Sequence, residues 1–177
     1  MWLGIIISIL VVLISIILFV YIVYYNKFQV AIIKISEAEE NINILLKEKL
    51  QLLLRINKFI EDKKVENKLL GIEKIANKEL NNFELNSELD KFNKKIIEIT
   101  DYSKDVLFED NELEVISILN KVNIDCLAAQ RYYNDNVVVY NKLVKCFPSN
   151  IVAKFSKYKI KDFYSNEKEE IFEILKK

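Results

Sequence analysis

The chain has 177 residues, with 26 basic and 26 acidic side chains, no histidine, two glycines and one proline. Zero net charge gives no overall field that would attract nucleic acid, and the missing histidine excludes the usual general base and the Ser-His and Cys-His nucleophile pairs. So few glycines and prolines cannot supply the turns of several β-hairpins, whereas long periodic runs of Leu, Ile, Lys and Glu suit helices. The sequence therefore predicts an all-α protein.

The first predicted element is a transmembrane anchor over residues 1–25. No charged side chain occurs from Leu3 to Tyr25, and about 23 helical residues measure roughly 34 Å, enough to cross the hydrocarbon core of a bilayer. A cleavable signal peptide is the alternative, but its basic start, shorter apolar core and small-x-small cleavage site are missing. Aromatic residues stand at both ends, as membrane–water interfaces favour: Trp2, Tyr21, Tyr24 and Tyr25.

The charges beside the anchor bear on its orientation in the cell membrane. Lys27 and Lys34 follow the apolar segment and no charged side chain precedes it. The positive-inside rule then predicts an outside N-terminus and a cytoplasmic helical domain, while the opposite orientation stays open because the bias is small. Cys126 and Cys146 would lie roughly 30 Å apart on one helix, too far for a disulfide within the chain, and unpaired thiols fit a reducing compartment.

The sequence pattern of residues 26–148 predicts a long antiparallel bundle of the four-helix type, into which the membrane helix continues. Apolar residues recur at helical spacing from Phe28 to Phe59, so the first helix should extend as a stalk to a break at residues 61–64. A second helix should then end at Asn81-Asn82. Its apolar positions are Leu69, Leu70, Ile72, Ile75, Ala76 and Leu80.

Two further helices complete the predicted bundle. The third should span Leu85–Ile99 and end near residues 101–103. The fourth has an apolar stripe in steps of three and four from Leu113 to Phe147, which predicts a bundle seam with Cys126 in the core, and Pro148 should stop it. Helix lengths would bring the end of the fourth helix back toward the bilayer.

Residues 149–177 form a basic and aromatic tail. Two interpretations stay open: contact with a headgroup surface, or a solvated tail whose aromatic rings pack on the bundle. The residues predicted to contact the membrane surface are Lys154, Lys157, Tyr158, Lys159 and Lys161.

Three runs in this half of the chain form a recognisable pattern: Ala129-Gln130-Arg131-Tyr132-Tyr133-Asn134, Tyr140-Asn141, and Phe147-Pro148-Ser149-Asn150-Ile151-Val152-Ala153. The pattern resembles the signature of the LemA family. The resemblance implies an N-terminal membrane anchor, a long antiparallel helical bundle and no known reaction. The signature residues, for which we expect a structural role, are Arg131, Tyr133, Asn134, Tyr140, Asn141, Phe147, Pro148 and Asn150.

The chain departs from the family pattern at two places. Residues 51–57 lack the proline of the family's Asp-Leu-Ile-Pro-Asn-Leu-Val run, so we expect the first helix to be less kinked there. A Lys157-Tyr158 pair stands where the family tends to have Gly-Phe.

The Tyr-Asn pairs at 133–134 and 140–141 are seven residues apart, which places both tyrosines on one helix face and both asparagines on a neighbouring face. One interpretation is a recognition surface. The other is that the tyrosines fill the bundle seam while the asparagines fix the register between helices.

No residue pattern indicates a catalytic, metal or cofactor site. A di-iron bundle site needs Glu-x-x-His motifs, and a phosphate loop needs clustered glycines, whereas Gly4 and Gly71 stand alone. The sequence therefore predicts a non-catalytic, membrane-anchored protein-interaction or scaffold module without a cofactor. Its expected partners are membrane lipid and an unidentified protein, with homo-oligomerisation open and nucleic acid excluded. The alternative is a self-associating structural protein of the cell envelope.

Overall fold

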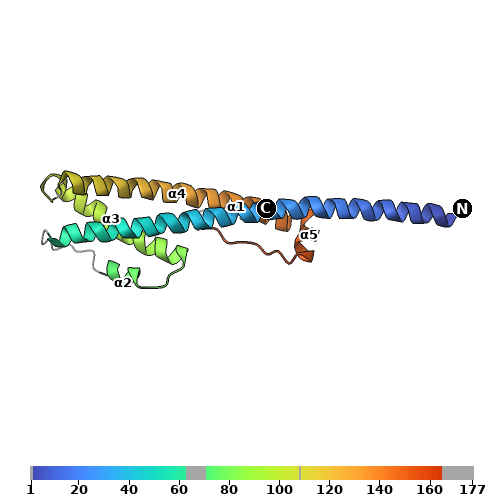
Figure 1. Cartoon of the computed structure of the whole chain (residues 1–177), viewed down its shortest axis with the longest axis horizontal. Coiled ribbons are helices and arrows are strands. Elements are labelled where there is room, and N and C mark those ends of the chain that lie inside the picture. The colour runs from blue at the N-terminus through green and yellow to red at the C-terminus, as the bar shows by residue number, and fades with distance from the viewer. Residues whose placement is uncertain (1, 63–70, 108, 165–177) are drawn as a thin grey trace, which may run out of the picture. The chain divides into compact units, whose positions relative to one another are not determined.

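The computed structural model describes residues 2–62, 71–107 and 109–164. Within these ranges the chain is helical and contains no strand, which confirms the all-α prediction. Contacts divide the chain into two compact units: a first unit of Met1–Glu37 with Tyr132–Lys177, and a second unit of Ala38–Arg131. The helices in chain order are α1 (Trp2–Asp62), α2 (Ile72–Ala76), α3 (Asn82–Leu107), α4 (Asp110–Lys145) and α5 (Ser149–Phe155) (Figure 1).

Helix α1 is a single helix of 61 residues that begins in the apolar segment. Every residue from Trp2 to Phe19 is exposed, so the apolar side chains surround the helix on all sides. The segment is long and apolar enough to span a membrane. The helix also continues through residues 51–57, where the family's proline is missing. The predicted stalk is therefore confirmed.

The second unit is a bundle of the second half of α1, the helix α3 and the first half of α4. In α1 and α4, buried residues recur every three or four positions and so form one stripe per helix, which is mainly apolar but includes Lys49 in α1. Cys126 lies in this core, as predicted. The core residues include Ile42, Leu46, Leu53, Ile56, Leu89, Phe92, Ile96, Val115, Leu119, Val122 and Cys126.

The helices between α1 and α4 differ from the prediction in length. Gly71 has a left-handed φ of 96° at the N-cap of α2, a conformation that glycine adopts at little cost, and α2 has only five residues. Asn81 does not end a helix but caps the start of α3: its Oδ1 accepts the N–H of Glu84 at 2.9 Å, and the Glu84 carboxylate accepts the N–H of Asn81 at 3.3 Å. The predicted residues Leu69 and Leu70 lie outside the described ranges.

Helix α3 is longer than predicted because it runs through residues 101–103 to Leu107. Asp, Tyr and Ser each lower helix propensity by only a fraction of a kcal/mol, roughly 0.5, so three of them do not end a helix already in place. Helix α4 ends at Lys145, shortly before Pro148, as predicted, but Phe147, the last residue of the predicted seam, lies beyond this end and is exposed. The sequence did not predict α5, which begins directly after that proline.

Candidate functional site: an asparagine clamp on the C-terminal segment

The two Tyr-Asn pairs of the family-like signature lie in the first unit, on the second half of α4. Tyr133, Asn134, Val137, Tyr140 and Asn141 are all buried there. Steps of three, four and seven place these side chains on one broad face of the helix. A non-helical stretch that follows α5, residues 156–164, covers this face, and we call it the C-terminal segment.

Asn134 and Asn141 hold the backbone of the C-terminal segment, and together we call them the asparagine clamp. The Nδ2 of Asn141 donates to the carbonyl of Lys161 at 2.8 Å, and the N–H of Lys161 donates to Oδ1 of Asn141 at 2.9 Å. The N–H of Tyr164 donates to Oδ1 of Asn134 at 2.7 Å. The sequence suggested that these asparagines pair between helices, whereas the structure joins them to the backbone of a non-helical segment.

The spacing of the clamp matches the geometry of an extended chain. Seven helical residues rise about 10.5 Å, and three residues of extended chain rise about 10 Å. Asn134 contacts Tyr164 and Asn141 contacts Lys161, so the segment runs antiparallel to α4. The clamp binds backbone atoms of the C-terminal segment and not its side chains. The seven-residue spacing of the two asparagines therefore determines which residues of the segment they contact.

Aromatic side chains fill the space between the clamped segment and the helices. The Tyr133 hydroxyl donates to the carbonyl of Asp162 at 3.2 Å, and the Tyr133 ring meets the Tyr164 ring edge to face at 5.9 Å. Such pairs contribute roughly 0.5–1.5 kcal/mol beyond the area they bury. These contacts hold the Tyr164 end of the C-terminal segment against α4.

A second aromatic cluster joins the segment to α1. The Tyr158 ring lies 4.8 Å from the Phe28 ring and 6.5 Å from the Tyr140 ring, and Gln29 Nε2 donates to the Tyr158 hydroxyl at 2.8 Å. Burial raises the pKa of Tyr140 and of Tyr158, and the neighbouring Tyr158 raises that of Tyr140 further. Both hydroxyls therefore stay protonated at neutral pH.

A tight turn after α5 directs the chain into the clamp. Lys157 has a φ of 57°, in the left-handed region. The N–H of Tyr158 donates to the carbonyl of Ala153 at 2.9 Å, and the N–H of Lys157 donates to that of Lys154 at 3.3 Å. These bonds form a Schellman motif, in which the left-handed residue is most often glycine. The motif gives a physical reason for the family's preference for glycine where this chain has Lys157.

The remaining predicted site residues lie in or beside the first unit. Arg131 and Phe147 are exposed, Pro148 is the N-cap of α5, and the N–H of Asn150 donates to the carbonyl of Cys146 at 2.8 Å. Among the residues predicted to contact the membrane surface, Lys154, Lys157 and Lys159 are exposed. Lys161 and Tyr158 are partly buried, and Tyr158 faces α1 and α4. Residues 165–177 of the predicted tail lie outside the described ranges.

Sequence reasoning missed the partners of the signature residues: Phe28, Lys161 and Tyr164. The only signal that could have found them was the seven-residue spacing of the asparagines, which fits an extended chain as well as a helix register.

The fold and this site define an all-α protein with one candidate N-terminal membrane span and a C-terminal segment clamped onto its helices. The model of the LemA family matches residues 65–174, more than half of the chain. The chain therefore belongs to the LemA family. No curated protein and no solved structure matches it.

Proposed function

We propose that the chain is a single-pass membrane protein that binds another protein through its helices and catalyses no reaction. The observation that carries the proposal is the uncharged segment of α1, in which every residue from Trp2 to Phe19 is exposed. Moving one large apolar side chain out of water contributes about 1.5–3 kcal/mol, so a segment of this length strongly favours a bilayer. Anchoring confines the rest of the chain to the membrane and raises its effective concentration for a partner there.

A paired substitution tests the anchor. Leu10→Lys with Leu13→Lys places two charges in the middle of the apolar segment, at about 2.5–3.5 kcal/mol each on insertion. The matched control, Ile124→Lys with Leu127→Lys, places the same charges on exposed positions of the second unit. We expect the first variant to leave the alkali-resistant membrane fraction and the control to remain. If both stay in the membrane fraction, the anchor proposal is wrong.

The orientation can be measured with the same cells. We propose a cytoplasmic bundle on the lysine bias after the anchor, so a C-terminal tag should resist a membrane-impermeant protease in intact cells. Digestion of the tag in intact cells would instead place the bundle outside.

The exposed apolar pair Ile124 and Leu127, one turn apart on α4 in the second unit, supports protein binding. Apolar positions at this spacing are typical of contacts between helices. A photoreactive amino acid at Leu127 in the membrane-embedded protein should cross-link to a different protein. The same amino acid at Asp125, an exposed position of the same helix that is turned away from Leu127, is the matched control and should not. The absence of any product specific to position 127 would contradict the proposal.

Self-association as a structural protein of the cell envelope is the second candidate function. Gly4 and Ser8 lie one helical turn apart on the apolar segment, and no neighbouring atom comes within 4 Å of a Cβ placed on Gly4. Small residues at this spacing let two membrane helices approach closely. Chemical cross-linking in membranes would then give only homo-oligomers, which Gly4→Leu should reduce while Ile5→Leu leaves them unchanged.

A further inference from the structure

Helix α5 has two chemically different faces. Ser149, Val152 and Ala153 are buried against the rest of the first unit. Ile151 and Phe155 lie on the opposite side of the helix, and Phe147, in the turn just before α5, is exposed as well. The exposed fractions of Phe147, Ile151 and Phe155 are 79%, 48% and 78%. We call these three residues the apolar edge.

The exposed fractions of the apolar edge resemble those of the apolar segment of α1. Phe19 of that segment is 69% exposed and Leu18 is 55% exposed. Exposed apolar side chains beside an exposed lysine, here Lys154, are typical of a helix that lies at the boundary between water and lipid.

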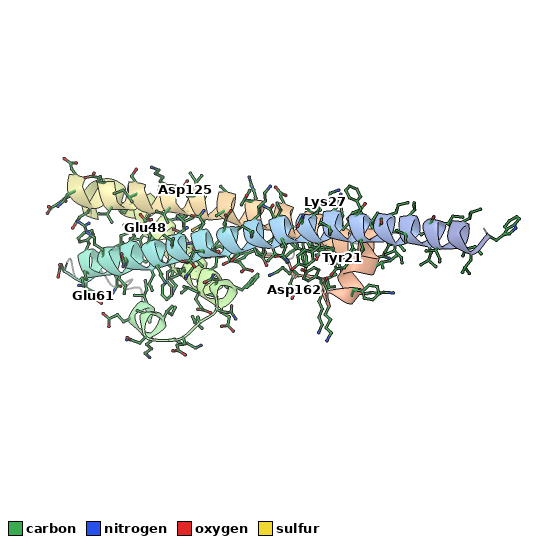
Figure 2. The ribbon with its side chains drawn as sticks, turned by 45° about the vertical axis from the view of Figure 1, so that its right-hand side comes forward. Tyr21, Lys27, Glu48, Glu61, Asp125 and Asp162 are labelled. Atoms are coloured by element: carbon green, nitrogen blue, oxygen red, sulfur yellow. The ribbon has the colours of Figure 1, made fainter. Side chains whose placement is uncertain are left out.

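A hydrogen bond places the apolar edge beside the end of the apolar segment. The hydroxyls of Tyr21 and Ser156 lie 3.3 Å apart, and Ser156 directly follows Phe155. Figure 2 labels Tyr21 on α1 and Asp162 on the C-terminal segment that lies beside this part of the helix. Tyr21 lies roughly 27 Å along the helix from Leu3, close to the thickness of about 30 Å of a hydrocarbon core. The end of α5 therefore lies at the depth where a membrane-spanning α1 would leave the acyl chains.

The charged side chains near the apolar edge are also those expected at the depth where α1 would leave the acyl chains. Lys154, Lys157 and Lys159 are exposed on or just after α5. Lysine side chains can extend their ammonium groups to lipid headgroups while neighbouring apolar side chains enter the acyl region. The Tyr158 ring, in contrast, packs against Phe28, whereas the Phe155 ring is exposed.

We propose that the apolar edge inserts into the bilayer on the side where α1 emerges, so that α5 is a second, interfacial membrane contact. This inference rests on the proposed membrane anchor and adds a lipid-binding surface far along the chain from it. The occupant of the surface is the lipid bilayer, because the edge lies beside the apolar segment and exposed lysines surround it.

Tryptophan fluorescence tests the inference, since Trp2 is the single tryptophan of the chain. In a Trp2→Phe background, Phe155→Trp and Ile151→Trp report on the apolar edge. Tyr132→Trp is the matched control, an exposed aromatic position on α4 of the same unit. Full-length protein is reconstituted into phosphatidylcholine–phosphatidylglycerol vesicles at high lipid excess, which separates single copies, with or without lipids brominated near the headgroup.

We expect the emission from positions 155 and 151 to shift to the blue and to be quenched by the brominated lipids, and the emission from position 132 to change little. Quenching of native Trp2 in the unmodified protein reports on the anchor independently. If Trp2 is quenched and positions 155 and 151 are not, the inference is overturned while the anchor stands. Equal quenching at position 132 would also overturn it, because the contact would not be specific to the edge. No quenching anywhere would refute the anchor and the inference together.

Discussion

Asn141 binds both polar backbone groups of Lys161, 20 residues further along the chain, with hydrogen bonds of 2.8 and 2.9 Å. A neighbouring strand would offer an extended segment the same pair of bonds, so the side-chain amide here takes the place of a strand. Backbone groups that leave water need such partners. The asparagine clamp therefore lets a non-helical segment pack against a helical protein without a sheet.

The first prediction concerns Asn141→Ala. The substitution removes both hydrogen bonds, and at roughly 1 kcal/mol each, with a further penalty for the groups left behind, we expect a loss of about 2–3 kcal/mol. Chemical unfolding of the full-length protein in detergent micelles measures this loss. Hydrogen exchange at residues 158–164 should also become faster.

Asn136→Ala is the matched control for the clamp. Its amide donates to the carbonyl of Tyr132 within the same helix, on the exposed side, and surface changes of this kind stay within about 0.5 kcal/mol. Equal losses for both variants would contradict the clamp.

The second prediction is that Lys157→Gly stabilises the protein. A non-glycine residue in the left-handed region costs about 1–2 kcal/mol, and the greater freedom of glycine in the unfolded chain offsets part of this gain. We expect a net increase of about 0.5–1 kcal/mol in the free energy of unfolding. Lys159 is not in the left-handed region, so Lys159→Gly relieves no strain and should slightly decrease the free energy of unfolding. If the free energy of unfolding changed in the same direction in both variants, this would contradict the role of the turn.

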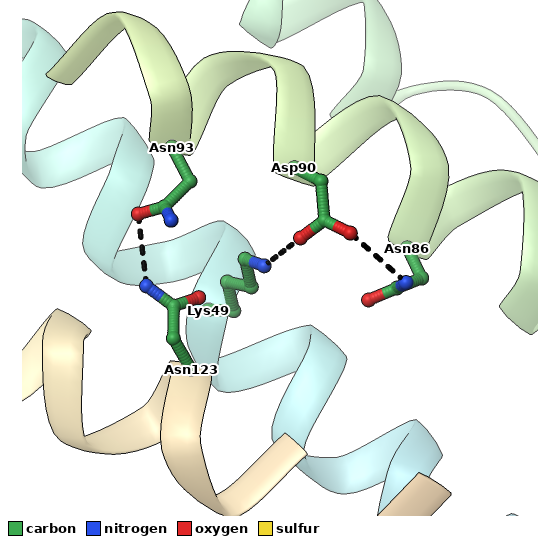
Figure 3. A network of polar contacts seen from close by, with 5 residues as sticks. All are labelled: Lys49, Asn86, Asp90, Asn93 and Asn123. Atoms are coloured by element: carbon green, nitrogen blue, oxygen red, sulfur yellow. Dashed lines mark hydrogen bonds and ion pairs between the residues drawn. The ribbon is translucent and has the colours of Figure 1, made fainter. Parts of the chain in front are cut away.

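The third prediction concerns an ion pair in the second unit of which only the cation is buried. Lys49 Nζ lies 2.6 Å from Asp90 Oδ1, and the side chain of Lys49 is 2% exposed whereas that of Asp90 is 49% exposed (Figure 3). Asn86 Nδ2 donates to the second oxygen of Asp90 at 3.1 Å, and Asn123 Nδ2 donates to Oδ1 of Asn93 at 2.8 Å. The ion pair thus joins α1 to α3, and the separate hydrogen bond between Asn123 and Asn93 joins α4 to α3.

Removing only the acid should destabilise more than removing the buried cation. Asp90→Asn leaves Lys49 buried without its counter-charge, and we expect a loss of about 2 kcal/mol because the partial exposure of Asp90 limits the effect. Lys49→Met replaces the cation with an apolar side chain of similar size and should change stability by less than about 1 kcal/mol. Thermal unfolding of both variants measures which of them is less stable. A larger loss of stability for Lys49→Met than for Asp90→Asn would refute this account.

The fourth prediction concerns the two cysteines. Cys126 is buried and Cys146 is exposed, and burial raises the pKa of the Cys126 thiol from 9.0 to about 11. The thiolate is the reactive form. In the folded protein a maleimide should therefore label Cys146 quickly and Cys126 only after unfolding, as mass spectrometry of the labelled peptides would measure. Equal labelling rates in the folded protein would contradict the burial of Cys126.

The raised pKa of Cys126 also predicts a pH dependence. Between pH 9.0 and about 11 the thiol ionises in the unfolded chain before it does in the folded protein. Its contribution to stability is thus fully present below pH 9.0 and is lost as the pH rises through about 11. The loss amounts to about 2–3 kcal/mol. Cys126→Ala should remove this part of the decline in stability at high pH. Identical profiles of stability against pH for the unmodified protein and the variant would rule out this contribution of Cys126.

The sequence by itself determined the features that depend on composition and on periodicity within one helix. The uncharged stretch Leu3–Tyr25 predicted the exposed apolar segment, and the stripe along α4 predicted the buried position of Cys126. Both follow from local rules, because the side chains on one helix face repeat every 3.6 residues whatever lies opposite them.

Only the tertiary structure decided what the asparagines bind, that Tyr158 faces inward, and that Lys157 adopts a left-handed turn. Each of these depends on groups far apart in sequence, such as Asn134 with Tyr164 or Gln29 with Tyr158. A side-chain amide can bond a helix, a strand or water with similar energy, so its partner is set by which segment the fold brings within about 3 Å.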